Sequence, residues 1–359
     1  MRRVPLLLFL LLSLVTMPLF SETLKPDERV QFVRGLAHVT TDGVVEADVT
    51  AWVHEHEQRP GAKTLFAKLT GIDLASLSAD EAARFDQRTQ LFRYDAERGK
   101  RLRLLLADEQ SRLLPVTDSD GMSRDRVRFG PVDQLPLQQA EGAPPLLRFR
   151  VALEQEDTRR FEGELVLVPP HGLSIVSDID DTIKRSQVRD RNELIRNTFV
   201  REFKSVPGMA DWYQAHAAAN DSTRFHYLSS SPHQLWPALD AFLQDSRFPI
   251  GSVHLRQIKL LDELLSNGDS SRQHKLGSLH QLVQQFPQRQ FVLVGDSGEA
   301  DPEIYAEIAR AYPAQVVGIY IRDVTGEAAD APRYQQTFAG LTPPWQIFSD
   351  PAELPTPKR

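Results

Sequence analysis

The chain has 359 residues, of which 25% are charged and 41% are hydrophobic, and its formal net charge is −7. This length and composition are typical of a globular protein with two domains. The acidic balance and the lack of any basic cluster argue against nucleic acid as a partner. The chain contains no cysteine, which excludes disulfides, thiolate nucleophiles and cysteine-ligated metal sites.

The first residues are typical of an export signal. Arg2 and Arg3 precede an uncharged, largely apolar run over residues 5–20, and a charged start before a short apolar segment is the pattern of a secretory leader. We predict a signal peptide over residues 1–21, with an uncleaved membrane anchor as the alternative, although the run is short for a membrane span. An exported protein without disulfides fits a bacterial periplasm.

The hydrophobic pattern of residues 22–170 predicts a mainly β, sandwich-like domain. From Val45 to Val53 an apolar residue occupies every second position, which is typical of a half-buried strand. Ser78 and Glu81 form a capping box that begins a helical interruption. Further strands are predicted at residues 101–107, 147–153 and 161–168, of which the last two form a hairpin.

Two histidines on the first of these strands deserve a separate interpretation. His54 and His56 are two apart, so they point to the same side of a strand and could share a metal ion. No third ligand is evident, and a protein metal site needs at least three. We therefore interpret both as exposed polar side chains.

From residue 171 to residue 359 strands alternate with helices, which predicts an α/β domain with a parallel sheet covered on both faces. The helices are expected at residues 192–203, 207–219, around 239–242, at 275–286 and from 302. The strands are expected at residues 173–177, 224–228, 253–255, 291–294, 316–321 and 345–348.

The first strand of this domain ends in acidic residues. Asp178, Asp180 and Asp181 follow an apolar run and precede Thr182. Asp178 and Asp180 are two apart, so both can face one pocket at the carboxyl end of the strand, where open α/β sheets bind ligands. Unpaired carboxylates are costly to bury, whereas Mg²⁺ prefers carboxylate and phosphate oxygens. The sequence therefore predicts a Mg²⁺ site here; the alternative is an acidic turn that caps the next helix.

Two serines and a lysine further along the chain are candidate phosphate-binding residues. Ser229 and Ser230 lie between a predicted strand and a helix whose first turn would suit Pro232, and free amides at such a point bind anions. Lys275 begins a later predicted helix and can neutralise charge that develops on a phosphoryl group. The ordinary alternatives are a serine that caps its helix and a solvated lysine.

The last signal follows the buried strand at residues 291–294. Asp296 comes directly after Gly295, and Glu299 and Asp301 can supply further oxygens to a metal ion or to its waters. Acidic residues from two strand ends would thus meet around one cation.

These parts are what phosphoryl transfer to an aspartate needs. Asp178 would attack phosphorus and form an aspartyl-phosphate, and Asp180 would protonate the leaving alkoxide and then activate water. Mg²⁺ would be bound by Asp178, the backbone carbonyl of Asp180, Asp296 and Asp301. The phosphate oxygens would be held by Thr182, Ser229, Ser230 and Lys275.

In these motifs the chain resembles the haloacid dehalogenase (HAD) superfamily. More narrowly, it is similar to the actin-patch-associated phosphatidate phosphatases in residues 177–184, 225–232, 274–275 and 291–305. This resemblance implies a HAD-like Rossmannoid three-layer α/β/α fold and Mg²⁺-dependent removal of phosphate from phosphatidate to give diacylglycerol. One departure from the family pattern is His233, which replaces an aromatic residue after Ser-Pro.

Two other functions stay open. The same chemistry would serve soluble phosphomonoesters, and a third reading is a lipid- or protein-binding module with a degenerate catalytic domain. The segment 190–203 is either an amphipathic helix packed on its own domain or a lid that faces lipid. The sequence allows peripheral contact with a membrane and does not define an oligomeric state.

Overall fold

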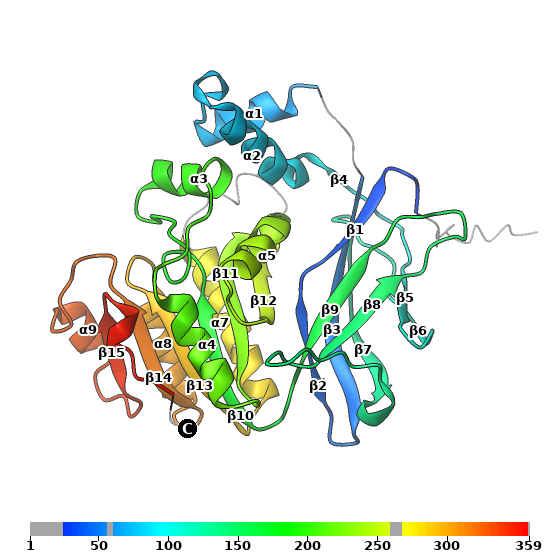
Figure 1. Cartoon of the computed structure of the whole chain (residues 1–359). Helices are drawn as coiled ribbons and strands as arrows, with labels where there is room; N and C mark the ends of the chain where they lie inside the picture. The colour runs from blue at the N-terminus through cyan, green and yellow to red at the C-terminus, as the bar shows by residue number, and fades with distance from the viewer. Residues whose placement is uncertain (1–23, 56–59, 259–267, 358–359) are drawn as a thin grey trace, which may run out of the picture.

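The chain folds into a β-rich part and an α/β part that lie side by side (Figure 1). The computed structural model describes residues 24–55, 60–258 and 268–357. The predicted signal peptide and His56 lie outside these ranges. Within them, no helix is both long and apolar enough to traverse a lipid bilayer.

The β-rich part is a nine-stranded sheet in the order β1-β3-β2-β9-β8-β5-β6, with β4 and β7 paired to β3. Its strands pair antiparallel except β2 and β9, and the predicted hairpin of β8 and β9 is confirmed. One hydrophobic cluster joins seven of the strands. The strands are β1 (Glu28–Phe32), β2 (Gly35–Val39), β3 (Val44–Glu55), β4 (Asp95–Ala96), β5 (Arg103–Leu106), β6 (Ser111–Leu113), β7 (Met122–Pro131), β8 (Leu146–Val151) and β9 (Glu162–Val168).

The second face of β3 is more buried than its alternating sequence predicts. His54 is only 3% exposed, and its ring lies 5.1 Å from Tyr94 and 4.2 Å from Trp52 between centroids. Trp52 in turn meets His233 of the α/β part edge to face at 4.8 Å. The interpretation of His54 as an exposed side chain is therefore wrong, because the α/β part and the segment around Tyr94 cover this face.

The α/β part has the predicted fold, a six-stranded sheet in the order β12-β11-β10-β13-β14-β15 in which every pair is parallel. Its strands are β10 (Gly172–Asp178), β11 (Arg224–Pro232), β12 (Gly251–Arg256), β13 (Arg289–Asp296), β14 (Val316–Arg322) and β15 (Trp345–Phe348).

Helices cover both faces of this sheet. One hydrophobic cluster packs α3, α4 and α5 against one face, and a second packs α7, α8 and α9 against the other. The three layers position the carboxyl ends of the strands along a single edge. The helices are α3 (Arg191–Phe199), α4 (Met209–Ala219), α5 (Trp236–Asp245), α7 (Gly268–Gln285), α8 (Asp301–Ala311) and α9 (Pro332–Thr337).

Three predicted boundaries near the site are wrong. Strand β11 continues through the serines to Pro232, because Ser229 and Pro232 still pair with β12 across a bulge. Helix α5 begins only at Trp236, after a 3₁₀ turn at His233–Leu235, so Pro232 is not in its first turn. Helix α7 begins at Gly268, which places Lys275 inside the helix rather than at its start.

A helical insertion in the β-rich half, defined as residues 62–93, packs on the α/β part. It contains α1 (Ala62–Thr70) and α2 (Ala79–Thr89), and the predicted capping box of α2 is present. Phe66 belongs to the same hydrophobic cluster as Phe199 of α3 and lies 5.2 Å from it. Arg88 donates to the carbonyl oxygens of Thr198 and Arg201 at 2.9 and 2.7 Å. The insertion therefore shares its core with the α/β part.

The connection between the two halves is held by a buried arginine. The guanidinium of Arg289, at the start of β13, donates to the carbonyl oxygens of Pro169 and His171 and to Ser174 Oγ at 2.5 to 2.9 Å. A guanidinium in this fork satisfies several carbonyls at once. The predicted boundary near residue 171 is thus a short segment fixed against the sheet.

Candidate active site

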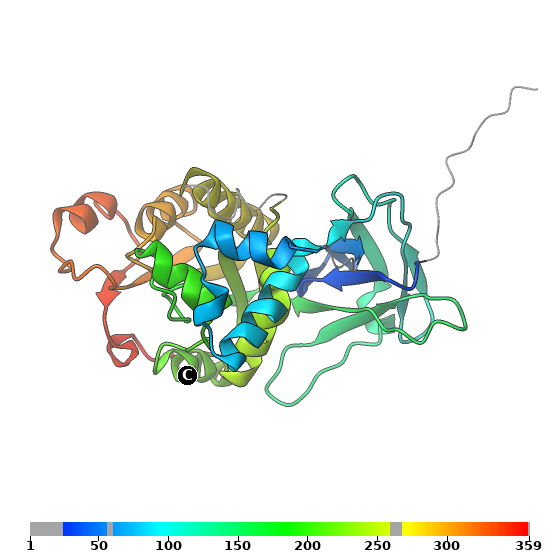
Figure 2. The same cartoon turned by 90° about the horizontal axis from the view of Figure 1, so that it is seen from above.

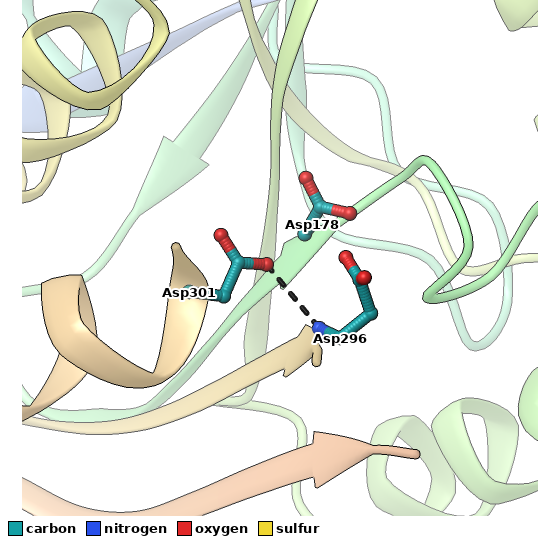
Figure 3. Close-up of side chains that lie close together, drawn as sticks. All are labelled: Asp178, Asp296 and Asp301. Carbon is teal, nitrogen blue, oxygen red and sulfur yellow. Dashed lines mark hydrogen bonds between the residues drawn. The ribbon is translucent and has the colours of Figure 1, made fainter. Parts of the chain in front are cut away.

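Three aspartates from two neighbouring strands and one helix lie together at the carboxyl edge of the parallel sheet. Figure 3 shows Asp178 at the end of β10, Asp296 at the end of β13 and Asp301 at the start of α8. One carboxylate oxygen from each lies within 4.8 Å of the others, and all three side chains are buried. Strands β10 and β13 pair directly in parallel, so their last residues must share this edge.

The loop after β13 is shaped around these acids. Asp301 Oδ2 accepts a hydrogen bond from the backbone N–H of Asp296 at 3.3 Å, and Asp296 Oδ1 accepts from the N–H of Gly298 at 2.7 Å. A Cβ at Gly295 would come within 2.4 Å of Asp301 Oδ2 and 2.7 Å of the Tyr305 ring. Glycine is required at residue 295 because the Asp301 side chain lies against the backbone there.

Lys275 enters the same cluster from helix α7. Its Nζ lies 2.8 Å from Asp178 Oδ1, 2.6 Å from Asp301 Oδ1 and 2.9 Å from Glu299 Oε2, and the side chain is 1% exposed. The contact with Asp178 is an ion pair without hydrogen-bond geometry, whereas the other two are hydrogen bonds. Burial alone would lower the pKa of Lys275, but the surrounding carboxylates raise it well above its usual value. Lys275 is therefore a buried cation and not a solvated one.

The carboxylates outnumber this lysine. Burial raises the pKa of both Asp178 and Asp296 well above the usual value, and although Lys275 opposes this, the charge of Asp301 adds to it. Asp178 Oδ2 and Asp296 Oδ2 are buried without a hydrogen-bond partner among the described residues. Buried acceptors without donors are costly, and an all-oxygen set of this kind suits a hard divalent cation. The residues present therefore fit a Mg²⁺ ion.

Asp180 lies apart from this cluster. Its carboxylate accepts hydrogen bonds from Ser186 at 2.7 Å, Ser229 at 3.0 Å and Ser231 at 3.1 Å, and it pairs with Lys184 Nζ at 2.7 Å. Burial would raise the pKa of Asp180, but Lys184 and the serine hydroxyls lower it to about 2. The Asp180 side chain is an ionised acceptor here. Its predicted role as a metal ligand through the backbone carbonyl stays a prediction.

Asp181 organises the loop that follows. It has a positive φ of 55°, a conformation that aspartate tolerates better than most residues. Its Oδ1 accepts from the backbone N–H groups of Ser186 and Gln187 at 2.8 Å each, and its Oδ2 accepts from that of Val188 at 2.7 Å. Of the three acids that end the first strand, only Asp178 therefore joins the cluster with its side chain.

The predicted phosphate-binding residues occupy three different places. Thr182 is fully buried, and its hydroxyl has no hydrogen-bond partner in the part of the chain that the structure describes. Ser229 donates to Asp180 and accepts from the N–H of Ser231 at 2.9 Å. Ser230 bonds to the hydroxyl of Ser271 in α7. Among the described residues, the Thr182 hydroxyl is therefore without a partner, whereas Ser229 and Ser230 are hydrogen-bonded.

Two cavities lie near the cluster. The smaller, about 240 Å³, reaches the cluster itself and is lined by Lys275, Glu299 and Asp301 together with Val188 and Arg272. The larger cavity, of about 1200 Å³, is bordered by the loop at residues 181–190. Its lining is mainly polar and charged and comes from this loop, α2 and α3. A phosphoryl group would have to enter the smaller cavity.

The sequence reasoning missed two cations beside the acidic motif. Lys184 pairs with Asp180, which lies four residues earlier. A lysine four residues after an acid of the motif could have indicated this ion pair. Arg322 ends β14 and donates to the carbonyl oxygen of Asp181 at 2.6 Å; a charged residue at the end of an apolar strand was the signal. His233, the residue that departs from the family pattern, lies away from the carboxylate cluster. It lies between the two halves of the molecule and, with Trp52, lines a cavity of about 620 Å³.

A three-layer parallel α/β domain with aspartates at two adjacent strand ends and a lysine among them is the architecture of a haloacid dehalogenase-like domain. Comparisons of sequence agree with this class. Residues 173–323 match the family model described as the phosphatidate phosphatase APP1 catalytic domain. This segment is therefore similar to that catalytic domain.

Two curated relatives are each similar over about half of the chain. The phosphatidate phosphatase APP1 of Saccharomyces cerevisiae is 34% identical over 175 residues, which are 47% of this chain and 29% of the yeast protein. An uncharacterised protein of Schizosaccharomyces pombe is 31% identical over 194 residues, which are 53% of this chain and 31% of the relative. The chain thus spans less than a third of the length of these relatives.

Proposed function

We propose that this protein is an exported, Mg²⁺-dependent phosphatase that hydrolyses phosphatidate or a related lipid phosphate to diacylglycerol and phosphate through an aspartyl-phosphate. The observation that carries this proposal is the cluster of Asp178, Asp296 and Asp301, with oxygens within 4.8 Å of one another. The similarity of residues 173–323 to the phosphatidate phosphatase catalytic domain supports the choice of substrate.

Asp178 is the nucleophile in this proposal. Its Oδ1 is paired with Lys275, and its Oδ2 is buried without a hydrogen-bond partner among the described residues. A carboxylate oxygen without such a partner attacks phosphorus, the ester oxygen leaves as an alkoxide, and the phosphoryl group is carried on Asp178. Lys275, which contacts Asp178, would stabilise the negative charge that develops on the phosphoryl oxygens in this step.

Asp180 transfers the protons. It gives a proton to the leaving alkoxide and then takes one from the water that attacks phosphorus, which releases phosphate and restores Asp178. In the structure Asp180 is ionised and held by Lys184 and by serine hydroxyls, which suits the second, proton-accepting step. To act first as an acid, it must be protonated and leave this ion pair.

Mg²⁺ would be held by Asp178, Asp296 and Asp301, and when bound it would offset the repulsion between these carboxylates and the phosphate. Lys275 and Thr182 contribute through contacts that do not depend on the metal ion. Lys275 fixes Asp178 and Asp301 in place through contacts of 2.8 and 2.6 Å. In this proposal the hydroxyl of Thr182, which has no hydrogen-bond partner among the described residues, would donate to a phosphate oxygen.

The test is phosphate release by the purified protein from phosphatidate in detergent micelles. We expect turnover that requires Mg²⁺, that stops with a chelator, and that falls by on the order of 10³-fold or more in Asp178→Asn. The matched control is Asp211→Asn, a change at an acid that is 78% exposed on α4. Full activity in Asp178→Asn would reject Asp178 as the nucleophile.

A soluble phosphomonoester is the second candidate substrate. The 1200 Å³ cavity beside the catalytic loop is lined mainly by charged and polar groups such as Arg84, Arg185 and Lys204, which favours a polar substrate body over acyl chains. Phosphatidate and a soluble aryl phosphate, assayed side by side with the same enzyme, separate the two. Higher kcat/KM on soluble esters would replace the lipid proposal and keep the chemistry.

A further inference from the structure

Helix α1 carries an apolar pair that faces water. Three large hydrophobic side chains are strongly exposed among the described residues: Leu65 at 58%, Leu69 at 43% and Leu113 at 42%. Leu65 and Leu69 are four residues apart on α1, so they lie on the same side of the helix. Single exposed leucines are ordinary; here two of the three strongly exposed side chains lie next to each other on one helix face.

The opposite side of α1 is fixed in the protein core. Phe66 and Ala67 are buried, and the Phe66 ring meets Phe85 of α2 at 6.0 Å and Phe199 of α3 at 5.2 Å. Arg84 of α2 adds a hydrogen bond to the carbonyl oxygen of Val200 at 2.7 Å. One side of α1 is packed in this way, and among the described residues its leucine pair stays exposed on the other side.

The charge of α1 is opposite to that of the whole chain. The chain has a net charge of −7, but the helix contains Lys63 and Lys68 and no acidic residue. Lys68 is exposed beside Leu69, and Lys63 pairs with Asp86 at 3.3 Å. A helix that combines an apolar face with lysines binds the surface of an anionic lipid bilayer.

The position of α1 relates this surface to the active site. Figures 1 and 2 show that the helical insertion lies over the α/β part, next to α3 and on the side where the loop after β10 emerges. The carboxylate cluster lies at that same edge of the sheet. A bilayer that touches α1 would therefore face the side of the molecule that holds the candidate catalytic residues.

We propose that α1 docks the protein on an anionic phospholipid surface, with Leu65 and Leu69 inserted among the lipids and Lys68 against their phosphates. This inference rests on the proposed function, because it explains how an enzyme without a described membrane span reaches a lipid phosphate. Two leucines and one or two lysines give weak and reversible binding. The protein would bind, turn over substrate and leave.

The experiment is sedimentation of the full chain with vesicles of phosphatidylcholine that contain phosphatidylglycerol and no phosphatidate, so that binding is measured without turnover. We expect the double variant Leu65→Ser/Leu69→Ser to bind roughly tenfold more weakly or worse. Lys68→Glu should weaken binding by about fivefold or more, and salt or neutral vesicles should weaken the binding of the unaltered protein. Leu113→Ser is the matched control. Leu113 is about as exposed as Leu69, but it lies on β6 of the nine-stranded sheet and not on α1.

Activity gives an independent readout. The double variant should hydrolyse a soluble aryl phosphate as the unaltered protein does and lose rate only on phosphatidate in vesicles. Equal vesicle binding by the double variant and the unaltered protein, or an equal loss in Leu113→Ser, overturns the docking proposal. Vesicle binding that depends on Leu65 and Leu69 without turnover of any phosphate ester supports docking and overturns the phosphatase function alone.

Discussion

The ammonium group of Lys275 lies 2.8 Å from a carboxylate oxygen of Asp178, although the first belongs to helix α7 and the second to the end of strand β10. Both side chains are 1% exposed. Because the same ammonium also contacts Asp301 and Glu299, it is the basic residue that holds this group of acids together.

Replacing this lysine should therefore be costly. Lys275→Met leaves Asp178 and Asp301 buried without their cation, and breaking a buried ion pair from one side costs about 3–5 kcal/mol. Urea denaturation in the presence of a chelator measures the change. Lys68→Met, at an exposed position of α1, should alter stability by about 0.5 kcal/mol or less. Equal stability of the two variants would show that Lys275 does not hold the acids.

Asp296→Asn should have the opposite effect on the metal-free protein. Burial and the charge of Asp301 raise the pKa of Asp296, so near neutral pH its ionised form opposes folding. An amide keeps the acceptor for the Gly298 N–H and can donate toward Asp301, so we expect a gain of about 1–2 kcal/mol with a chelator present.

The same variant should respond less to Mg²⁺. A ligand that binds only the folded state raises the unfolding temperature, and a tighter ligand raises it more. Asp296 is one of the three carboxylates expected to bind the metal. Thermal unfolding with and without Mg²⁺ measures both effects, with Asp211→Asn as the control. An undiminished Mg²⁺ shift in Asp296→Asn would place the metal elsewhere.

Asp180 should make the protein sensitive to acid. Its pKa falls from 3.8 to about 2 in the folded state, so its contribution to stability is present above the unfolded pKa and is lost as the pH falls through the folded pKa. The full contribution is about 2–3 kcal/mol, of which roughly 1 kcal/mol disappears between about pH 6 and about pH 3. Urea denaturation at both pH values should show this extra loss relative to Asp180→Asn, in which residue 180 does not titrate. Parallel pH profiles would contradict the ion pair with Lys184.

Arg88 should anchor the helical insertion. Its guanidinium lies 3.6 Å from the centre of the Phe203 ring and donates to the carbonyl oxygens of Thr198, in the last turn of α3, and of Arg201, just after that helix. Burial lowers the pKa of Arg88 to about 9. Arg88→Ala should cost about 2–3 kcal/mol and speed amide hydrogen exchange in α1 and α2. Arg191→Ala, at the exposed first residue of α3, is the control. Unchanged exchange in α1 and α2 would show that other contacts hold the insertion.

The approach of Asp178 and Asp296 could be predicted because it follows from topology. The apolar runs before them are buried strands, and parallel strands bring their carboxyl ends to one edge. Lys275 was predicted for the site, but its helix was expected to start too late, since the polar first turns of α7 carry no apolar stripe.

Other features depend on contacts that a local pattern does not contain. Asp181 adopts a positive φ and accepts hydrogen bonds from three backbone amides, and the spacing of the acids in the motif gives no sign of this. The apolar face of α2 indicates that the helix packs against another element but does not identify it. In the structure Phe85 of α2 meets Phe66 of α1 and shares one hydrophobic cluster with Phe199 of α3. The burial of His54 likewise depends on the other half of the molecule.

The shared core of the helical insertion has a consequence for any attempt to divide the protein. A fragment that starts at residue 171 would lack Phe66 and Phe92, whose rings pack against Phe199 at 5.2 and 5.7 Å, and would expose an aromatic surface to solvent. Such a surface promotes aggregation. An isolated α/β part would therefore tend to aggregate, and a fragment that keeps this surface covered has to include residues 62–93.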